Sequence, residues 1–151
     1  MFKIIVELFF LVIIQAAITP FIRRLAFVLG AVDNPNARRV NKKPMPTLGG
    51  LGIFVTYNIG AFVLLREQFP THELFSVLLA SSVVVLTGMI DDILELKPRQ
   101  KMIGIFVAAL IIYFLAGIRM NVLNLPFIHN EVHLGWWSLP ITIFWILALT
   151  N

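Results

Sequence analysis

The sequence lacks cysteine altogether and is poor in charge, since only 13% of its 151 residues are Asp, Glu, Lys or Arg. The absence of cysteine excludes a disulfide framework and a thiolate metal site. The scarcity of charge excludes an ordinary soluble domain, because the surface of such a domain needs far more charged side chains. Apolar residues instead make up 59% of the chain and raise its mean hydropathy to +0.91. The composition therefore predicts an integral membrane protein.

The apolar residues gather in five runs separated by polar segments, which predicts an all-α, polytopic protein with about five transmembrane helices. A helix needs about 20 mostly apolar residues to cross a bilayer, and the first four runs meet this requirement. The first run is not expected to be a secretory signal peptide, because it holds Glu7 and Gln15 and has no small-residue cleavage site. The five expected helices cover Ile4 to Ile22, Thr47 to Leu65, Glu73 to Ile90, Met102 to Ile118 and, as the shortest, Gly135 to Thr150.

The basic residues are distributed unequally between the two sides of these helices. Lys and Arg are enriched in cytoplasmic loops of membrane proteins. Nine fall on one side and three on the other, so we expect the N-terminus outside and residues 23–46 and 91–101 in the cytoplasm. The net charge of +4 then reflects the membrane topology. The sequence has no basic stripe interleaved with aromatic residues, so it does not indicate a nucleic-acid binding site. The nine are Arg23, Arg24, Arg38, Arg39, Lys42, Lys43, Lys97, Arg99 and Lys101, against Lys3, Arg66 and Arg119.

The segment "RRVNKKPMPTLGG", residues 38–50, combines basic residues, two prolines and a double glycine. Gly30 before it predicts the end of the first helix. Gly49, Gly50 and Gly52 begin the second helix without side chains, which permits close approach of another helix or of an anion to backbone N–H groups. Two interpretations stay open on the residues alone: anchoring to the membrane surface with small-residue packing, or binding of a phosphate group.

The segment from residue 118 to 134 predicts a short extracytoplasmic β-hairpin, because "IRMNVLNL" partly alternates and is followed by the turn-like "PFIHNEVHL". His129 and His133 lie four residues apart, a spacing that suits a metal on a helix. In an extended segment without an accompanying carboxylate motif, we expect them to be surface histidines.

Two adjacent aspartates, Asp91 and Asp92, end the third apolar run. The C-terminal end of a helix is partially negative, so each aspartate there is unfavourable by about 0.3–1 kcal/mol. Adjacent carboxylates also repel each other unless a cation compensates. Mg²⁺ binds one or two carboxylates and leaves room for phosphate and water. The pair therefore indicates either a Mg²⁺–phosphate site, with Lys97, Arg99 and Lys101 following, or a solvated helix end.

Three stretches together carry a family resemblance: "DNPNARRVNKKPMPTLGG", "GMIDDILELKPRQK" and "FWILALTN". In this order and spacing they resemble the polyprenyl-phosphate N-acetylhexosamine-1-phosphate transferases, glycosyltransferase family 4. The pattern "DxPNxRR" is similar to the undecaprenyl-phosphate GlcNAc-1-phosphate transferase branch, while the lipid I branch usually has a lysine at the position of Glu95. Asn41 departs from the family, which commonly has histidine there, although an amide can still hydrogen-bond a phosphate.

The resemblance implies a fold of ten or eleven transmembrane helices, of which this chain offers five. Residues 1–151 are therefore expected to form a single N-terminal part of a transferase domain, inactive by itself. In the family, the asparagine that matches Asn151 begins a further acidic motif, and a histidine-containing motif follows later. Both would lie beyond this sequence.

The implied reaction transfers GlcNAc-1-phosphate from UDP-GlcNAc to undecaprenyl phosphate at the bacterial plasma membrane and releases UMP. It would initiate a cell-envelope glycopolymer such as a teichoic acid or O-antigen. The implied partners are both substrates and the lipid bilayer, without nucleic acid, and the resemblance leaves room for a homodimer. Asp91 and Asp92 would be catalytic and hold Mg²⁺, or Mn²⁺ in its place. The implied phosphate- and substrate-binding residues are Arg38, Arg39, Asn41, Lys43, Gly49, Gly50, Lys101 and Asn151.

Two alternatives remain beside this reading. The first is the phospho-MurNAc-pentapeptide transferase branch, which makes lipid I. The second is a non-enzymatic membrane transporter or assembly subunit, in which the charged residues only set the topology.

Overall fold

The computed structural model describes residues 2–35, 42–65, 67–124 and 131–150, and these residues are mostly helical. Five α-helices within them follow the five apolar runs of the sequence, which confirms the helical fold that the composition predicts. The helices are α1 (Phe2–Leu29), α2 (Gly49–Leu65), α3 (Thr71–Leu94), α4 (Pro98–Phe114) and α5 (Ser138–Thr150), the last preceded by the 3-10 turn η1 (Gly135–Trp137).

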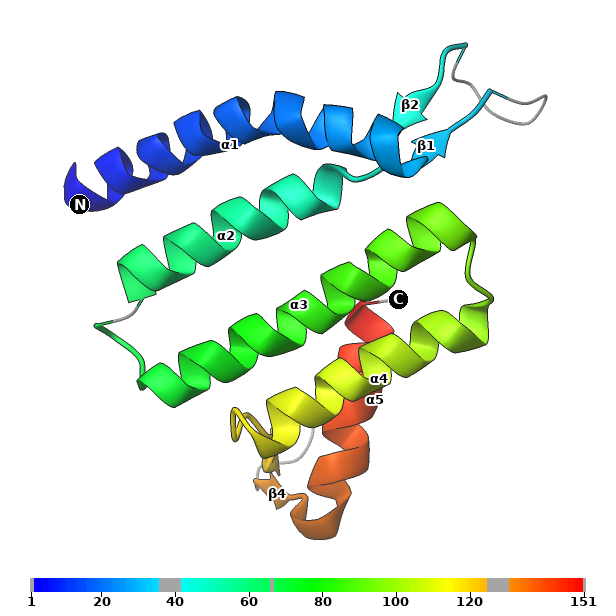
Figure 1. The fold of residues 1–151 in the computed structure, drawn as a ribbon. Coiled ribbons are helices and arrows are strands. Elements are labelled where there is room, and N and C mark those ends of the chain that lie inside the picture. Colours follow the sequence, from blue (N-terminus) through cyan, green and yellow to red (C-terminus); the bar gives the residue numbers. More distant parts are fainter. Residues whose placement is uncertain (1, 36–41, 66, 125–130, 151) are drawn as a thin grey trace.

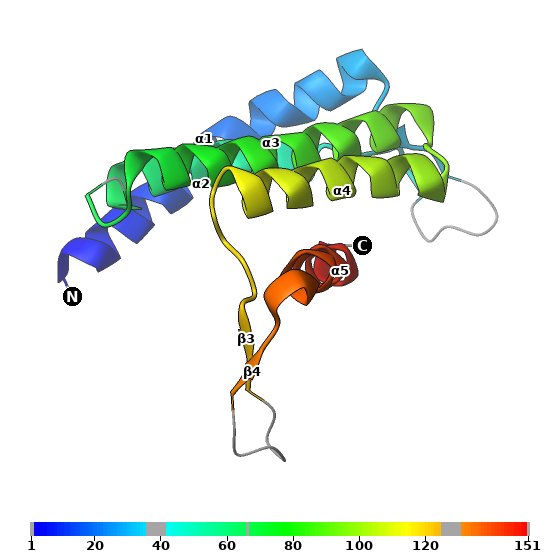
Figure 2. The same cartoon turned by 90° about the horizontal axis from the view of Figure 1, so that it is seen from below.

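Helices α1 to α4 lie side by side in sequence order, each running opposite to the one before (Figure 1). Helix α5 packs against α4 on one face of this layer, as Figure 2 shows. The alternation brings the end of α1, the start of α2, the end of α3 and the start of α4 to one end of the layer. We call this end, formed by residues 23–35, 42–50 and 91–101, the polar end.

The expected hairpin after α4 is present. Strand β3 (Val122–Leu123) pairs antiparallel with β4 (Val132–His133), and Val122 lies opposite His133. His133 is exposed, whereas His129 lies outside the described residues. In Figure 2 this hairpin projects away from the helical layer. We call residues 115–124 and 131–138, which include the hairpin and η1, the aromatic end.

A second hairpin, which the sequence did not predict, forms at the polar end. Strand β1 (Val32–Asp33) pairs antiparallel with β2 (Met45–Pro46), and Val32 lies opposite Pro46. A proline favours an extended backbone in the residue before it, but its missing N–H cannot extend a hydrogen-bonded ladder. The hairpin is accordingly short.

Helix α1 extends beyond its apolar run to the end that Gly30 predicts, and this corrects the expected position of two arginines. Its apolar run was expected to end at Ile22, with Arg23 and Arg24 in a loop. Both arginines lie inside α1, which continues past Pro20 to Leu29. The nine residues after Pro20 contain no further helix breaker, so the helix ends only at Gly30, whose φ of 74° is left-handed.

Within the described residues, two helices are long and apolar enough to cross a membrane, namely α1 from Ile4 onward and α3. The apolar helices Gly49–Leu65 and Gly135–Thr150 are shorter. Large apolar side chains are exposed along α1, including Phe9 at 66% and Phe21 at 68%. Exposure of this kind is expected where lipid covers the surface. These features indicate a membrane protein, while the crossing by all five helices and their orientation stay predictions.

Close contacts between neighbouring helices occur where glycine faces a side chain. A Cβ added to Gly52 would lie 3.1 Å from the side chain of Gln15, and one added to Gly60 would lie 2.8 Å from Leu11. The side chain of Gln15 also accepts a hydrogen bond from Thr56 at 2.6 Å, between α1 and α2. These contacts show the small-residue packing expected at membrane helix interfaces.

A small buried cluster holds the polar end together. Ala26, Ala31 and Leu48 are buried, and Ile22 and Met89 pack against them. The cluster therefore joins the end of α1, the segment before α2 and the last turns of α3. It fixes the start of α2 next to the aspartates of α3.

Candidate active site at the polar end

The turn between α3 and α4 is closed by hydrogen bonds at three consecutive amides. The N–H of Glu95 donates to the carbonyl of Asp91 at 2.8 Å, and the N–H of Leu96 donates to Asp91 Oδ1 at 3.1 Å. The N–H of Lys97 donates to Oε1 of Gln100 at 3.0 Å, at the start of α4. Glu95 adopts a left-handed conformation with φ of 49°, which is uncommon for a residue other than glycine. The side chain of Asp91 thus stabilises an unusual turn.

The second oxygen of Asp91 forms an ion pair across this turn. Lys101 Nζ, on the first turns of α4, lies 3.1 Å from Asp91 Oδ2. The two side chains are partly shielded, with 41% of the lysine and 26% of the aspartate exposed. Fully exposed ion pairs contribute little to stability. This pair is partly shielded from water and spans an ordered turn, so we expect it to hold the lysine more firmly than a fully exposed pair would.

Asp92 is placed differently from its neighbour. Its side chain is exposed and lines the same cavity as Thr47. Thr47 is held in turn by Ala31, whose carbonyl accepts from the Thr47 N–H at 3.1 Å and from its hydroxyl at 3.0 Å. The segment before α2 therefore holds Thr47 in a fixed position, with its hydroxyl proton donated to the Ala31 carbonyl.

A cavity of about 220 Å³ gathers these groups between the start of α2, the end of α3 and the start of α4. We call it the aspartate cavity. Two of its lining residues are acidic and one is basic, so the lining carries a net charge of −1 when all three are ionised. Such a lining favours a cation, together with a phosphate that lysine can contact. The residues are Thr47, Leu48, Gly50, Leu51, Val85, Gly88, Met89, Asp91, Asp92 and Lys101.

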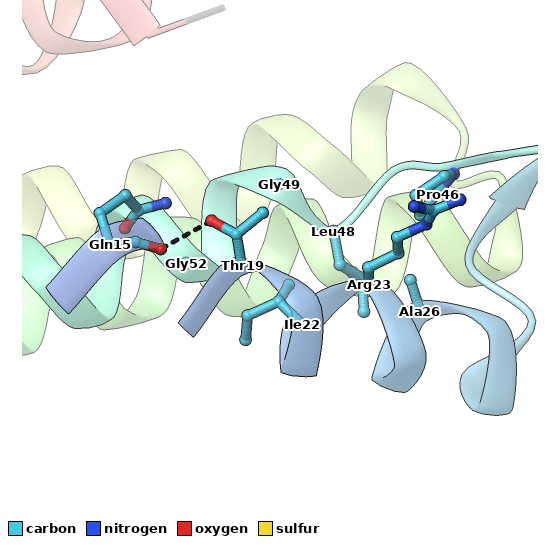
Figure 3. Close-up of a pocket in the computed structure, with 9 residues that line it drawn as sticks. All are labelled: Gln15, Thr19, Ile22, Arg23, Ala26, Pro46, Leu48, Gly49 and Gly52. Carbon is cyan, nitrogen blue, oxygen red and sulfur yellow. Dashed lines mark hydrogen bonds between the residues drawn. The ribbon is translucent and has the colours of Figure 1, made fainter. Parts of the chain in front are cut away.

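On the other side of Leu48 lies a smaller hollow between α1 and the start of α2, of about 160 Å³. Figure 3 shows Arg23 extending along it toward Pro46. Arg23 also lines an adjoining hollow with Lys42 and Lys43. The polar end therefore has a basic surface beside the aspartate cavity, which suits anionic groups.

The structure brings together part of the predicted site. Asp91, Asp92, Gly50 and Lys101 all line the aspartate cavity. Lys43 lines the neighbouring basic hollow instead. Gly49 lines the hollow on the α1 side. The predicted residues Arg38, Arg39, Asn41 and Asn151 lie outside the described part of the chain.

The glycines at the start of α2 differ in what surrounds them. A Cβ on Gly49 or Gly50 would meet no atom within 4 Å among those that the structure describes, whereas one on Gly52 would meet Gln15. The close helix contact expected for this glycine group therefore falls at Gly52. At Gly49 and Gly50 the close approach of a ligand stays a prediction.

Two residues of this end were missed by sequence reasoning. Thr47 belongs to the "PMPTLGG" stretch, but nothing local indicates that it lines one cavity with Asp92, which is far away in the sequence. Arg23 was counted only as a topology signal, yet it lines both the hollow between α1 and α2 and the adjoining basic hollow. Its place between the apolar run that ends at Ile22 and the apolar residues 25–29 is the signal that could have drawn attention to it.

The residues of the aspartate cavity could supply only some of the ligands that Mg²⁺ needs. Within the described part of the chain, no group of three or more His, Cys, Asp or Glu side chains gathers at one place. Mg²⁺ commonly takes one or two carboxylates and completes its shell with water and substrate phosphates. The exposed Asp92, with a neighbouring hydroxyl and a lysine for phosphate, fits that requirement.

The fold and this cavity define a helical, strongly apolar protein that carries paired carboxylates and a lysine at one end. The sequence profile described as "Glycosyl transferase family 4" matches residues 74–151, about half of the chain and including the aspartate pair. The chain therefore belongs to Glycosyl transferase family 4, which confirms the resemblance seen in its sequence.

Individual relatives match over nearly the whole chain. The probable undecaprenyl-phosphate N-acetylglucosaminyl 1-phosphate transferase of Bacillus subtilis is 32% identical over 152 residues, covering 100% of this chain and 41% of the relative. The undecaprenyl-phosphate alpha-N-acetylglucosaminyl 1-phosphate transferase of Yersinia pestis is 28% identical, covering 96% and 39%. The phospho-N-acetylmuramoyl-pentapeptide-transferase of Bacillus velezensis is also 28% identical, covering 100% and 50%.

The chain thus spans between about two-fifths and half of the length of these curated relatives. No solved structure matches it.

Proposed function

We propose that this chain forms part of a membrane enzyme that transfers GlcNAc-1-phosphate from UDP-GlcNAc to undecaprenyl phosphate and releases UMP. The observation that carries the proposal is the aspartate cavity, where Asp91, Asp92 and Lys101 meet the start of α2. The 32% identity with the Bacillus subtilis relative, over the whole of this chain, supports the GlcNAc branch.

The reaction is a phosphoryl transfer. An oxygen of the lipid phosphate attacks the β-phosphorus of UDP-GlcNAc, the bridging bond to the α-phosphate breaks, and UMP leaves. Most of the catalytic effect in such reactions comes from positioning the phosphates and stabilising their charge. The aspartate pair with Lys101 supplies carboxylates for a cation and an ammonium group for phosphate oxygens within one cavity.

Mg²⁺, bound through the aspartates, would neutralise phosphate charge as the bond changes take place. Lys101 is directed at the same space and is suited to contact a phosphate oxygen. The basic hollow with Arg23, Lys42 and Lys43 lies beside the cavity and would attract both anionic substrates to the polar end.

The proposal is tested with a chimera in which residues 1–151 replace the aligned part of the Bacillus subtilis relative. We expect the purified chimera to release UMP only when UDP-GlcNAc, undecaprenyl phosphate and Mg²⁺ are all present. Residues 1–151 without the remaining part of the relative serve as a control. We expect no release from them, because they span only 41% of that protein's length.

Two other outcomes have defined meanings. Release with UDP-MurNAc-pentapeptide and not with UDP-GlcNAc would assign the chain to the branch of the Bacillus velezensis relative. A chimera that inserts and purifies like the parent enzyme but releases no UMP from either donor would support the non-enzymatic alternative and contradict the proposal.

A further inference from the structure

Three hollows among the described residues follow one another along the line where α1 packs against α2. The middle one is the hollow of about 160 Å³ beside Leu48, and Figure 3 shows Gln15 at one end of it and Arg23 at the other. Gln15 also lines a hollow of about 520 Å³ further from the polar end. Arg23 also lines the basic hollow, of about 510 Å³. The three hollows therefore form one groove along α1, which we call the α1–α2 groove.

The two ends of the α1–α2 groove differ in their chemistry. The end away from the polar end is mostly apolar, with Leu8, Val12 and Ile53 in its lining. At the basic hollow, three of the described lining residues are basic and none is acidic. Asp33 lies opposite Met45 in the neighbouring hairpin, so the charge there is still +2 when Asp33 is counted with these three. A groove of this kind is complementary to a molecule with an apolar tail and an anionic headgroup.

The length of the α1–α2 groove matches the depth of one leaflet of a bilayer. From Arg23 to Leu8 the groove follows 15 residues of α1, which is about 22 Å at a rise of 1.5 Å per residue. Half of a bilayer, with its headgroup region, is about 20–22 Å deep. A lipid with its headgroup at Arg23 would therefore reach the middle of the membrane at the apolar end of the groove.

We propose that the α1–α2 groove binds one anionic phospholipid of the cytoplasmic leaflet, with its phosphate at Arg23 and Lys42 and one acyl chain between α1 and α2. Anionic lipids of the cytoplasmic leaflet attract basic residues at the ends of membrane helices, and the distribution of basic residues predicts that the polar end is cytoplasmic. Undecaprenyl phosphate also has a phosphate and an apolar tail, but its polyprenyl chain is longer than the groove. The inference does not depend on the proposed function, because the groove and the aspartate cavity lie on opposite sides of Leu48.

Two pairs of adjacent, identical residues provide matched variants. Arg23 lines the groove, whereas Arg24 lines none of its three hollows. Ala16 lines the apolar part, whereas Ala17 lines none of them. All four residues are exposed, so replacing any of them should leave the packing of the helices intact.

The first experiment counts bound lipid by native mass spectrometry, with residues 1–151 reconstituted in phosphatidylcholine nanodiscs that contain a small fraction of phosphatidylglycerol. We expect one phosphatidylglycerol to be retained about tenfold more strongly than phosphatidylcholine, because several basic side chains line the headgroup end. Arg23→Gln should weaken its retention about fivefold, the effect of one basic residue near a membrane surface. Ala16→Phe should weaken it at least as much, because the ring would take the space of the acyl chain. Arg24→Gln and Ala17→Phe should each leave retention within about twofold of the unmodified chain.

The second experiment locates the acyl chain in the unmodified protein, so it does not depend on how any variant folds. Phosphatidylglycerol with a photoreactive group at the end of one acyl chain is added to the same nanodiscs, and the cross-linked peptides are identified. We expect cross-links at residues 8–12 of α1 and 53–57 of α2, which line the apolar end of the groove. Cross-links spread evenly over the exposed faces of all the helices would overturn the proposal.

Three further results would also overturn it. Equal losses of retention in Arg23→Gln and Arg24→Gln, or in Ala16→Phe and Ala17→Phe, would show that lipid is attracted to the whole surface and not to the groove. Displacement of phosphatidylglycerol by inorganic phosphate would show a site for the anion alone. Displacement by undecaprenyl phosphate at a lower concentration than phosphatidylglycerol would assign the groove to that lipid. A chimera that releases no UMP would contradict the proposed function and leave these binding results unchanged.

Discussion

The two ends of the helical layer are built in different ways. At the polar end, four chain segments meet, and hydrogen bonds and an ion pair fix the groups around the aspartate cavity. At the aromatic end, Trp136 and Trp137 are 98% and 70% exposed. Arg119 there lies 4.8 Å from the centre of the Tyr113 ring and donates to the Tyr113 carbonyl at 3.2 Å.

The difference indicates a division of labour between the ends. Tryptophan is enriched at the interface between a bilayer and water, so the aromatic end is suited to anchoring. The polar end has charged groups held at defined positions, which is what recognition of phosphates requires. Chemistry is therefore expected at one end only, and changes at the two ends should have separate effects.

The largest effect expected is an all-or-none difference in labelling. The chain has no cysteine, so Asn34→Cys at the polar end and Asn121→Cys at the aromatic end introduce single reactive positions. In intact bacterial cells, a membrane-impermeant maleimide should label position 121 alone, and position 34 should react only after permeabilisation. Labelling of position 34 alone in intact cells would show the reverse orientation.

A second prediction concerns the contact that joins α3 to α4. A Cβ on Gly104 would overlap the side chain of Thr87, so Gly104→Ala should destabilise the chain by about 1–3 kcal/mol. Thermal unfolding in detergent measures this, and adding Thr87→Ala should recover part of the loss. Gly88→Ala is the control, because a Cβ there would meet no described atom within 4 Å. Equal unfolding temperatures for the two glycine variants would show that Gly104 does not lie against Thr87.

A smaller effect is expected at the bond between α1 and α2. Gln15→Leu removes the acceptor of the Thr56 hydroxyl and should cost about 0.5–2 kcal/mol, the range for polar bonds between membrane helices. A double-mutant cycle with Thr56→Val isolates the interaction. Thr19→Val is a matched control, since that hydroxyl bonds the Gln15 carbonyl within α1. Additive losses in the cycle would mean that the two side chains do not interact.

The smallest effect is expected from Arg119→Gln at the aromatic end. Loss of its contact with the Tyr113 ring should lower stability by about 0.5–1 kcal/mol, the usual value for an exposed cation–π pair. UMP release by the chimera should not change, because Arg119 follows the end of α4, whereas the aspartate cavity lies at the start of that helix. A loss of turnover as large as that of Lys101→Met would remove the distinction between the ends.

Features set by local sequence were predicted well. The five helices follow from apolar runs, the end of α1 from Gly30, and the β3–β4 hairpin from a partly alternating segment. The apolar run was ended at Ile22 and the two arginines after it were placed in a loop, although α1 continues through Arg23 and Arg24. Charge marks an energetic preference for the membrane edge, and it does not break a helix.

Features that depend on contacts between segments could not be predicted in the same way. The sequence identified Asp91 and Lys101 separately, but their ion pair requires the left-handed turn at Glu95. Glutamate rarely adopts this conformation, so the turn could not be predicted. The approach of Thr47 to Asp92 depends on packing of the α2 start against α3. Adjacent identical residues therefore looked equivalent in the sequence, although their surroundings differ.

The measurement that most directly tests the role of the polar end is UMP release by the chimera carrying Asp92→Asn. Removing a carboxylate that serves the cation and phosphates should lower the rate about 10²-fold or more. Glu95→Gln, which removes a carboxylate from the neighbouring turn, should keep the rate within about threefold of the unmodified chimera. A near-normal rate for Asp92→Asn at saturating Mg²⁺, or an equal loss in both variants, would contradict a catalytic role for the aspartate cavity.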